Sequence, residues 1–169
     1  MTIGSQTSVL TDRDTRHPAA VAIARRAREH GNHPFGTLPA RPDGRVLLEA
    51  ENTVLAARDA TGHAETNPVR AASAAFDAEF PRGCALYTCT EPCAMCVGAI
   101  CWGNIGRVVY VLGEDQLSAL TGANPENPTM EPPSRDVFAA GQRAPGVVGP
   151  IELAPARAAH HGFRRGRPA

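Results

Sequence analysis

Residues 90–96 read Thr-Glu-Pro-Cys-Ala-Met-Cys, directly ahead of an apolar segment that ends at Trp102. A proline breaks the chain just before this segment, so the pattern predicts a helix over 93–102 with Cys93 and Cys96 in its first turn. Residues three positions apart share one face of a helix, and the free N–H groups at a helix N-terminus stabilise thiolates. The two cysteines could therefore supply half of a tetrahedral zinc site, with Zn–S distances near ~2.3 Å.

A second informative stretch lies upstream and reads Thr61-Gly62-His63-Ala64-Glu65. His63 and the two cysteines make three ligands, which leave the fourth position of a zinc ion open for water, as in catalytic zinc sites. Glu65, near the metal without binding it, could move protons from that water to a substrate. The pairing of His-x-Glu with Pro-Cys-x-x-Cys is the signature of zinc deaminases that act on nucleobases.

The five cysteines allow a rival interpretation, a closed structural zinc site built from Cys84, Cys89, Cys93 and Cys96. On a strand, Cys84 and Cys89 are an odd number of residues apart and point to opposite faces, so they do not converge on one metal. We therefore reject this site and interpret Cys101 as a buried apolar residue. Because an odd number of cysteines cannot all pair, reduced thiols or metal ligands are favoured over disulfides.

Composition excludes several classes of function. All 17 basic residues of the 169-residue chain are arginine, which rules out a lysine nucleophile, a Schiff-base enzyme and a P-loop NTPase. The 17 acidic residues bring the net charge to zero, which disfavours a general nucleic-acid binder. We expect no membrane span, because no apolar stretch approaches ~18 residues, and no secretory signal, and hence a cytoplasmic protein.

The order of predicted elements indicates an α/β protein with a mixed sheet. We expect one domain over 1–169, with 1–12 disordered and a C-terminal helix and tail over 154–169. Between them the patterns predict a helix over 15–31, a hairpin over 35–41 and 45–54, a helix over 63–79, a strand over 85–88, the helix over 93–102, a strand over 108–112, helical turns over 114–120, a proline-rich loop over 121–134 and a last strand over 147–153. Strands that alternate with helices after a hairpin are typical of layered α/β folds.

Together these motifs resemble the cytidine deaminase superfamily, in the branch of guanine deaminases and tRNA adenosine deaminases. The resemblance runs from about His33 to Tyr110 and also rests on His33-Pro34-Phe35-Gly36, Asn52 and Gly98-Ala99-Ile100. It implies a three-layer α/β/α fold with a mixed five-stranded sheet and an N-terminal hairpin. It also implies a homodimer, in which C-terminal segments often contribute across the interface.

The resemblance assigns roles to individual residues. His63, Cys93 and Cys96 would hold one zinc ion with a catalytic water, and Glu65 would be the proton shuttle of a hydrolytic deamination. Among the substrate-binding positions it implies are Asn52 as a hydrogen-bond partner of the base, Phe35 as a ring-packing side chain, Ala64, and Trp102 near the pocket and the dimer surface. Our candidate for a second catalytic carboxylate is Glu126, with Glu114 and Asp115 as alternatives.

The substrate is the most open part of the interpretation. The segment 33–36 resembles the guanine deaminases, and neutral charge with few aromatic residues disfavours a tRNA substrate. We therefore favour a free nucleobase, guanine first. Cytosine, an amino-s-triazine or a pterin-like ring, an adenosine in tRNA, and an inactive zinc-binding partner subunit are the alternatives. The tRNA alternative is favoured by the basic residues near the C-terminus, which are Arg157, Arg164, Arg165 and Arg167.

Several residues outside the metal motif carry further expectations. Pro39 falls in the first strand, where it removes a ladder donor, so that strand should be distorted or short. Pro68 falls near the start of the predicted helix over 63–79, where a missing N–H costs little. We expect Glu91 to stabilise a helix start rather than to catalyse. His160, His161 and Phe163 could cover a pocket, although packing on the surface is the simpler reading.

Overall fold

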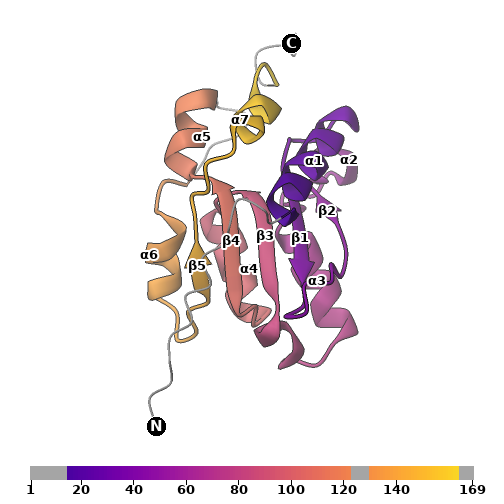
Figure 1. The fold of residues 1–169 in the computed structure, drawn as a ribbon, viewed down its shortest axis with the longest axis vertical. Coiled ribbons are helices and arrows are strands. Elements are labelled where there is room, and N and C mark those ends of the chain that lie inside the picture. The colour runs from indigo at the N-terminus through magenta and orange to yellow at the C-terminus, as the bar shows by residue number, and fades with distance from the viewer. Residues whose placement is uncertain (1–14, 123–129, 164–169) are drawn as a thin grey trace.

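A mixed five-stranded sheet forms the centre of the molecule (Figure 1). The computed structural model describes residues 15–122 and 130–163. In the sheet order β2-β1-β3-β4-β5, β1 is antiparallel to both β2 and β3, whereas β3, β4 and β5 are parallel. The strands are β1 (Gly36–Ala40), β2 (Ala50–Glu51), β3 (Ala85–Thr90), β4 (Arg107–Leu112) and β5 (Gly146–Val148). The predicted mixed sheet of five strands is therefore confirmed.

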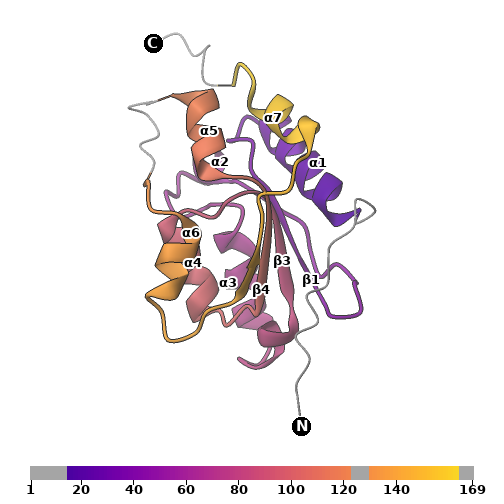
Figure 2. The same ribbon diagram turned by 60° about the vertical axis from the view of Figure 1, so that its left-hand side comes forward.

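Helices cover both faces of the sheet, which gives the predicted three layers (Figure 2). The helices α1 and α7 lie on one face, and α3, α4 and α6 lie on the other. Their bounds, with those of α2, α5 and the 3₁₀ helix η1, are α1 (Arg16–Glu29), α2 (Val54–Ala57), α3 (Thr66–Ala75), η1 (Phe80–Gly83), α4 (Ala94–Trp102), α5 (Glu114–Thr121), α6 (Ser134–Ala139) and α7 (Ala154–His160). None of the helices in the described ranges has an apolar run long enough to cross a membrane.

The two central strands are apolar on both faces because helices cover both. Leu86 and Val108 face the layer of α3, α4 and α6, where they pack with Phe138. Their neighbours Tyr87 and Val109 face the opposite layer and pack with residues of α1 and β1. This double burial explains the nearly continuous apolar run of β4, which is typical of parallel strands.

The N-terminal hairpin is shorter than its sequence suggests. β1 pairs with β3 from Thr37 to Ala40, so this pairing continues past Pro39, and β1 ends one residue later, short of the predicted range of 35–41. The carbonyl of Pro39 accepts a hydrogen bond from Leu47 N, which places the nitrogen of Pro39 on the same outer side, facing away from β3. The N–H that proline lacks would therefore have pointed toward the segment that leads into β2, not toward β3. β2 has only two residues.

Helix boundaries differ from the predictions where tertiary contacts decide them. The predicted helix over 63–79 begins only at Thr66 and ends at Ala75, with Pro68 as its third residue, where its missing N–H has no intrahelical partner to lose. Helix α6 lies in a segment for which no helix was predicted. The disorder expected for 1–12 falls outside the described residues.

Candidate metal centre and active site

The three predicted ligands converge at one point between α3 and α4. His63 lies in the turn that leads into α3, Cys93 occupies the N-cap position of α4, and Cys96 lies in the first turn of α4. The Nδ1 atom of His63 is 3.7 Å from Cys93 Sγ and 3.5 Å from Cys96 Sγ, and the two sulfur atoms are 3.6 Å apart. Within the described part of the chain, this trio is the group of His, Cys, Asp or Glu side chains placed to hold a metal ion.

The size of the triangle suits zinc. A tetrahedral zinc ion with Zn–S distances near ~2.3 Å and a Zn–N distance near ~2.0 Å requires ligand atoms roughly 3.5–3.8 Å apart. The three measured separations of 3.5–3.7 Å match this spacing. Cys84 and Cys89 do not join the group, since Cys84 Sγ contacts Phe80 O and Cys89 Sγ accepts a hydrogen bond from Gly36 N. A closed four-cysteine site is thereby excluded.

Glu65 lies beside this triangle and is 4% exposed. Its Oε1 accepts a hydrogen bond of 2.7 Å from Thr88 Oγ1 on β3, and its Oε2 lies 3.4 Å from Cys96 Sγ. One carboxylate oxygen thus faces the sheet and the other faces the ligand atoms. A carboxylate next to a metal, but outside its ligand set, is the arrangement that proton transfer requires.

The environment shifts the pKa values of these side chains in different directions. Burial raises the pKa of Glu65, although the hydroxyl of Thr88 and the charge of His63 oppose the shift. Contacts with Cys96 and then with His63 lower the pKa of the Cys93 thiol to about 4. The contact with Cys93, together with burial and the nearby Glu65, raises the pKa of Cys96. Buried groups with strongly perturbed pKa values gather at functional sites.

Asn52 and Phe35, two of the positions expected to contact a base, lie where β1 begins and β3 ends. Asn52, 2% exposed, donates its backbone N–H to Phe35 O, and its side-chain Oδ1 accepts from Val54 N. The residues on either side of Asn52 bind the side-chain amide of Asn67 in α3. Asn52 is thereby fixed between the start of β1 and the helix that follows His63. Ala64 is fully buried between His63 and Glu65.

The ring of Phe35 has a neighbour in the C-terminal helix. Its centroid lies 5.3 Å from that of His160, which is 7% exposed in α7. Phe163 contacts the ring of His33, and Arg28 of α1 donates hydrogen bonds to the carbonyls of Ala159 and His161. The C-terminal segment therefore packs on α1 and on the residues that lead into β1.

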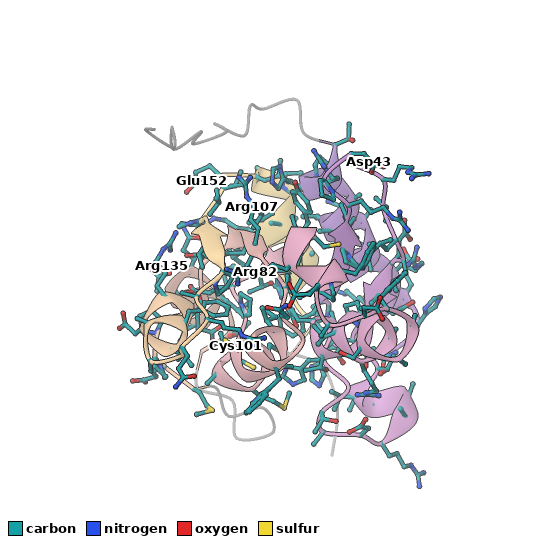
Figure 3. The ribbon with its side chains drawn as sticks, turned by 90° about the horizontal axis from the view of Figure 1, so that it is seen from below. Asp43, Arg82, Cys101, Arg107, Arg135 and Glu152 are labelled. Carbon is teal, nitrogen blue, oxygen red and sulfur yellow. The ribbon has the colours of Figure 1, made fainter. Side chains whose placement is uncertain are left out.

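Trp102 does not join the cluster within one chain. It ends α4, nine residues after Cys93, which corresponds to about 13 Å along the helix axis. Figure 3 shows its neighbour Cys101 on the face of the molecule that also carries Arg107, the first residue of β4. Trp102 itself is 92% exposed. A role at the pocket stays a prediction and would need a second subunit.

The predicted second carboxylate is not placed by the structure. Glu126 lies outside the described residues. The two alternatives, Glu114 and Asp115, occupy the first turn of α5, directly after β4. The backbone N–H of Glu114 donates to Glu91 Oε2, which connects the start of α5 to the turn that carries Cys93.

Glu91 links three segments around that turn. Its Oε1 accepts hydrogen bonds from the backbone N–H and the hydroxyl of Ser134, and its Oε2 accepts the N–H of Glu114. Glu91 therefore satisfies donors at the starts of α5 and α6, in agreement with the structural role predicted for it. Ser134, buried at 1% exposure, and Thr88 were not singled out in the sequence, since each gains its meaning from a partner distant in the chain.

We expect Glu91→Ala to lower the free energy of unfolding by about 2 kcal/mol, because it leaves three donors without their acceptor. Ser134→Ala, which removes only the hydroxyl, should cost about 1 kcal/mol. Urea unfolding of the zinc-loaded protein measures both. Glu79→Ala is the control, because Glu79 is exposed and makes no side-chain cap bond. Equal unfolding free energies for the Glu91 and Glu79 variants would contradict this role.

The fold and the cluster define a class: an α/β/α protein with a His-Cys-Cys metal centre beside a buried glutamate. A model of the cytidine and deoxycytidylate deaminase zinc-binding region matches residues 11–112, and the chain belongs to this family of zinc-dependent deaminases. A solved guanine deaminase from Nitrosomonas europaea shares the fold, with a TM-score of 0.74 and 21% identity over 94% of this chain and 87% of that one.

Similar proteins within the family carry different substrate names. A probable cytosine deaminase of Schizosaccharomyces pombe is 39% identical over 145 residues, 85% of this chain and 87% of that protein. The guanine deaminase of Bacillus subtilis is 40% identical over 77 residues, 46% of this chain and 49% of that protein. A tRNA-specific adenosine deaminase of Aquifex aeolicus is 33% identical over 91 residues, which are 54% of this chain and 60% of that protein. Membership of the family therefore does not select the substrate.

Proposed function

We propose that this chain hydrolytically deaminates a free nucleobase, with guanine as the first candidate, and that His63, Cys93 and Cys96 hold its zinc ion. The observation that carries the proposal is the position of Glu65. Its carboxylate is buried, and one oxygen lies 3.4 Å from Cys96 Sγ at the edge of the ligand triangle. An inactive zinc-binding subunit would have no need of this group.

In this proposal the side chains divide the work of replacing an amino group by oxygen. Zinc, when bound, supplies a water whose pKa is lowered toward ~7. Glu65 would take a proton from this water and pass it to a ring nitrogen while the water oxygen bonds to the ring carbon that carries the amino group. Glu65 would then move the second proton of the water to the amino nitrogen, so that the C–N bond breaks and ammonia leaves. Water and the aminated base thus become the oxo base and ammonia. Burial raises the pKa of Glu65 above its usual range, which favours uptake of a proton by this carboxylate.

Three further positions would orient the base. Asn52 would hydrogen-bond its edge, the ring of Phe35 would pack against its face, and Ala64 would contact it between His63 and Glu65. The fixed position of Asn52 supports its role, since Phe35 O and Val54 N hold it near the start of β1. A position held this way fits a pre-organised site. The ring of Phe35 packs with α1 and with His160 of α7, on the sheet face opposite α3 and α4, so its role rests on the resemblance alone.

Guanine and cytosine are both supported as substrates, by different observations. The segment His33-Pro34-Phe35-Gly36 resembles guanine deaminases, and the Bacillus subtilis relative supports the same choice. Cytosine is the second candidate, favoured by the Schizosaccharomyces pombe relative, which matches over 85% of this chain. An adenosine in tRNA is less favoured, because a net charge of zero provides no general attraction for phosphates.

Ammonia release from a panel of bases tests the proposal. Zinc-loaded protein is incubated with guanine, cytosine, adenine, ammeline and nucleosides, and Glu65→Ala serves as the control. We expect release from guanine, or from cytosine if the second candidate is correct, and none from the variant. No release from any small base, together with inosine formation in a tRNA anticodon stem, would overturn the free-base proposal.

We also propose that the chain forms a homodimer through α4. All nine residues of this helix are uncharged, and its last residue, Trp102, is 92% exposed. Met130 is another exposed apolar residue, at 56%. Light scattering of the protein as it elutes from a size-exclusion column should give a mass twice that of the 17.8 kDa chain. The Trp102→Arg substitution should shift the measured mass toward that of the monomer. A monomeric parent protein would refute this assembly.

A cytoplasmic location stays a prediction.

A further inference from the structure

Thr88 holds the carboxylate of Glu65 against the sheet. Its Oγ1 donates a hydrogen bond to Glu65 Oε1 at 2.7 Å, and the side chain is 1% exposed. Thr88 is paired on both sides, with Thr37 of β1 and Tyr110 of β4, so its backbone is fixed from two directions. The hydroxyl that meets Glu65 is therefore carried by a buried position that is paired on both sides.

The hydrogen bond distinguishes the two oxygens of the carboxylate. A threonine hydroxyl has one proton to donate, and here it goes to Oε1, so that Oε1 acts as an acceptor. The other oxygen, Oε2, is the one that lies 3.4 Å from Cys96 Sγ and faces the metal ligands. An anchored Oε1 leaves Oε2 to carry a transferred proton, with the carboxylate plane already oriented.

From this geometry we propose that Thr88 is a positioning residue for deamination, which fixes Glu65 so that Oε2 alone exchanges protons with water and the base. This inference rests on the proposed function, because it assigns Glu65 the proton-transfer role. In this role Thr88 contacts Glu65 and neither the base nor the metal. Its contribution would come entirely through the orientation of the Glu65 side chain.

The cross-strand partner of Thr88 provides a matched control. Thr37 lies directly opposite Thr88 in the antiparallel register, so the two side chains project from the same face of the sheet. Thr37 is also fully buried, at 0% exposure, yet its Oγ1 has no hydrogen-bond partner among the described residues. Valine at either position removes the same hydroxyl with the same change of shape, but at Thr88 alone does it remove a bond to Glu65.

Steady-state kinetics of the zinc-loaded variants test the proposal. We expect Thr88→Val to lower kcat by about tenfold to a hundredfold with little change in KM, because misplacing a catalytic group by ~1 Å can cost this much. Thr88→Ser, which keeps the hydroxyl, should return kcat to within about threefold of the parent, on the same reasoning. Thr37→Val should behave as the parent protein. If Thr88→Val does not fold, Thr88→Ala and Thr37→Ala replace the valine pair with the same expectations.

A second measurement does not depend on turnover. In crystal structures of the zinc-loaded variants, the Glu65 carboxylate should be displaced in Thr88→Val and unmoved in Thr37→Val, with zinc present in both. An unmoved carboxylate in Thr88→Val, or an unchanged kcat, would overturn the proposal. So would a serine variant as impaired as the valine variant. If the parent deaminates no base in the panel, the proposed function fails, while the position of the carboxylate still decides whether Thr88 anchors it.

Discussion

Replacing Glu65 by glutamine is expected to lower kcat by about two to four orders of magnitude while the protein keeps its zinc and its fold. Glutamine has almost the same shape, and its amide oxygen can still accept the hydrogen bond from Thr88 Oγ1. It cannot take up and release a proton, which is the step assigned to Glu65. Zinc analysis and thermal unfolding of the purified variant separate a chemical defect from a structural one.

The control for this experiment is Glu49→Gln. Glu49 is an exposed carboxylate that accepts a hydrogen bond of 2.8 Å from Arg26 Nη1, and the same change of charge should leave kcat within about twofold. If Glu65→Gln retained more than a tenth of the parent kcat, Glu65 would not be the proton shuttle. The alternative carboxylates Glu114, Asp115 and Glu126 would then be the next to substitute.

Cys96→Ser is expected to abolish zinc binding under ordinary purification and to reduce ammonia release to background. The side chain of Cys96 is fully buried, and a serine hydroxyl does not ionise to replace a thiolate ligand. Elemental analysis should fall from about one zinc per chain to below about a tenth, in line with the loss of one of three ligands. The loss should be visible in the metal content before any substrate is added.

Two other cysteines show whether the effect is specific. Cys84 is buried against Phe80 O, and Cys101 is the second-last residue of α4, where its Sγ contacts Arg143 O, so neither belongs to the ligand triangle. Cys84→Ala and Cys101→Ser should therefore retain zinc and activity. Loss of zinc in Cys84→Ala with no loss in Cys96→Ser would show that the metal is held by a different set of thiols.

The metal site was accessible from the sequence because its determinants are local. Pro92 sets the start of α4, and the helix geometry then places Cys93 and Cys96 on one side of its first turn. The pairing with His63 is not local, and the resemblance to a known family supplied it. The structure bears it out with separations of 3.5–3.7 Å. The bond from Thr88 to Glu65 had no comparable signal, because it depends on how α3 sits against the sheet.

The layered fold was also predictable, whereas several boundaries were not. The apolar run of β4 identifies a strand buried on both faces, and it does so without knowledge of its partners. Helix α6 is only six residues long, which is too short for a reliable periodic pattern, and Glu91 binds its first residue from 43 positions away. The turn at 42–44 is clear in the sequence, so a longer hairpin was expected. Whether Pro39 weakens the pairing with β2 or with β3 depends on which strand its nitrogen faces, and the sequence does not show this.

The joining of His63 to Cys93 and Cys96 also affects how the chain folds. Cys93 and Cys96 lie 30 and 33 positions after His63, so a metal ion bound by all three closes a long loop and favours the native chain over the unfolded one. Where zinc binds only the native chain, each tenfold rise in its free concentration above the dissociation constant adds about 1.4 kcal/mol to the free energy of unfolding. The melting temperature of this protein would then report the zinc supply of its surroundings, and a shortage of the ion would reduce the amount of folded protein as well as its activity.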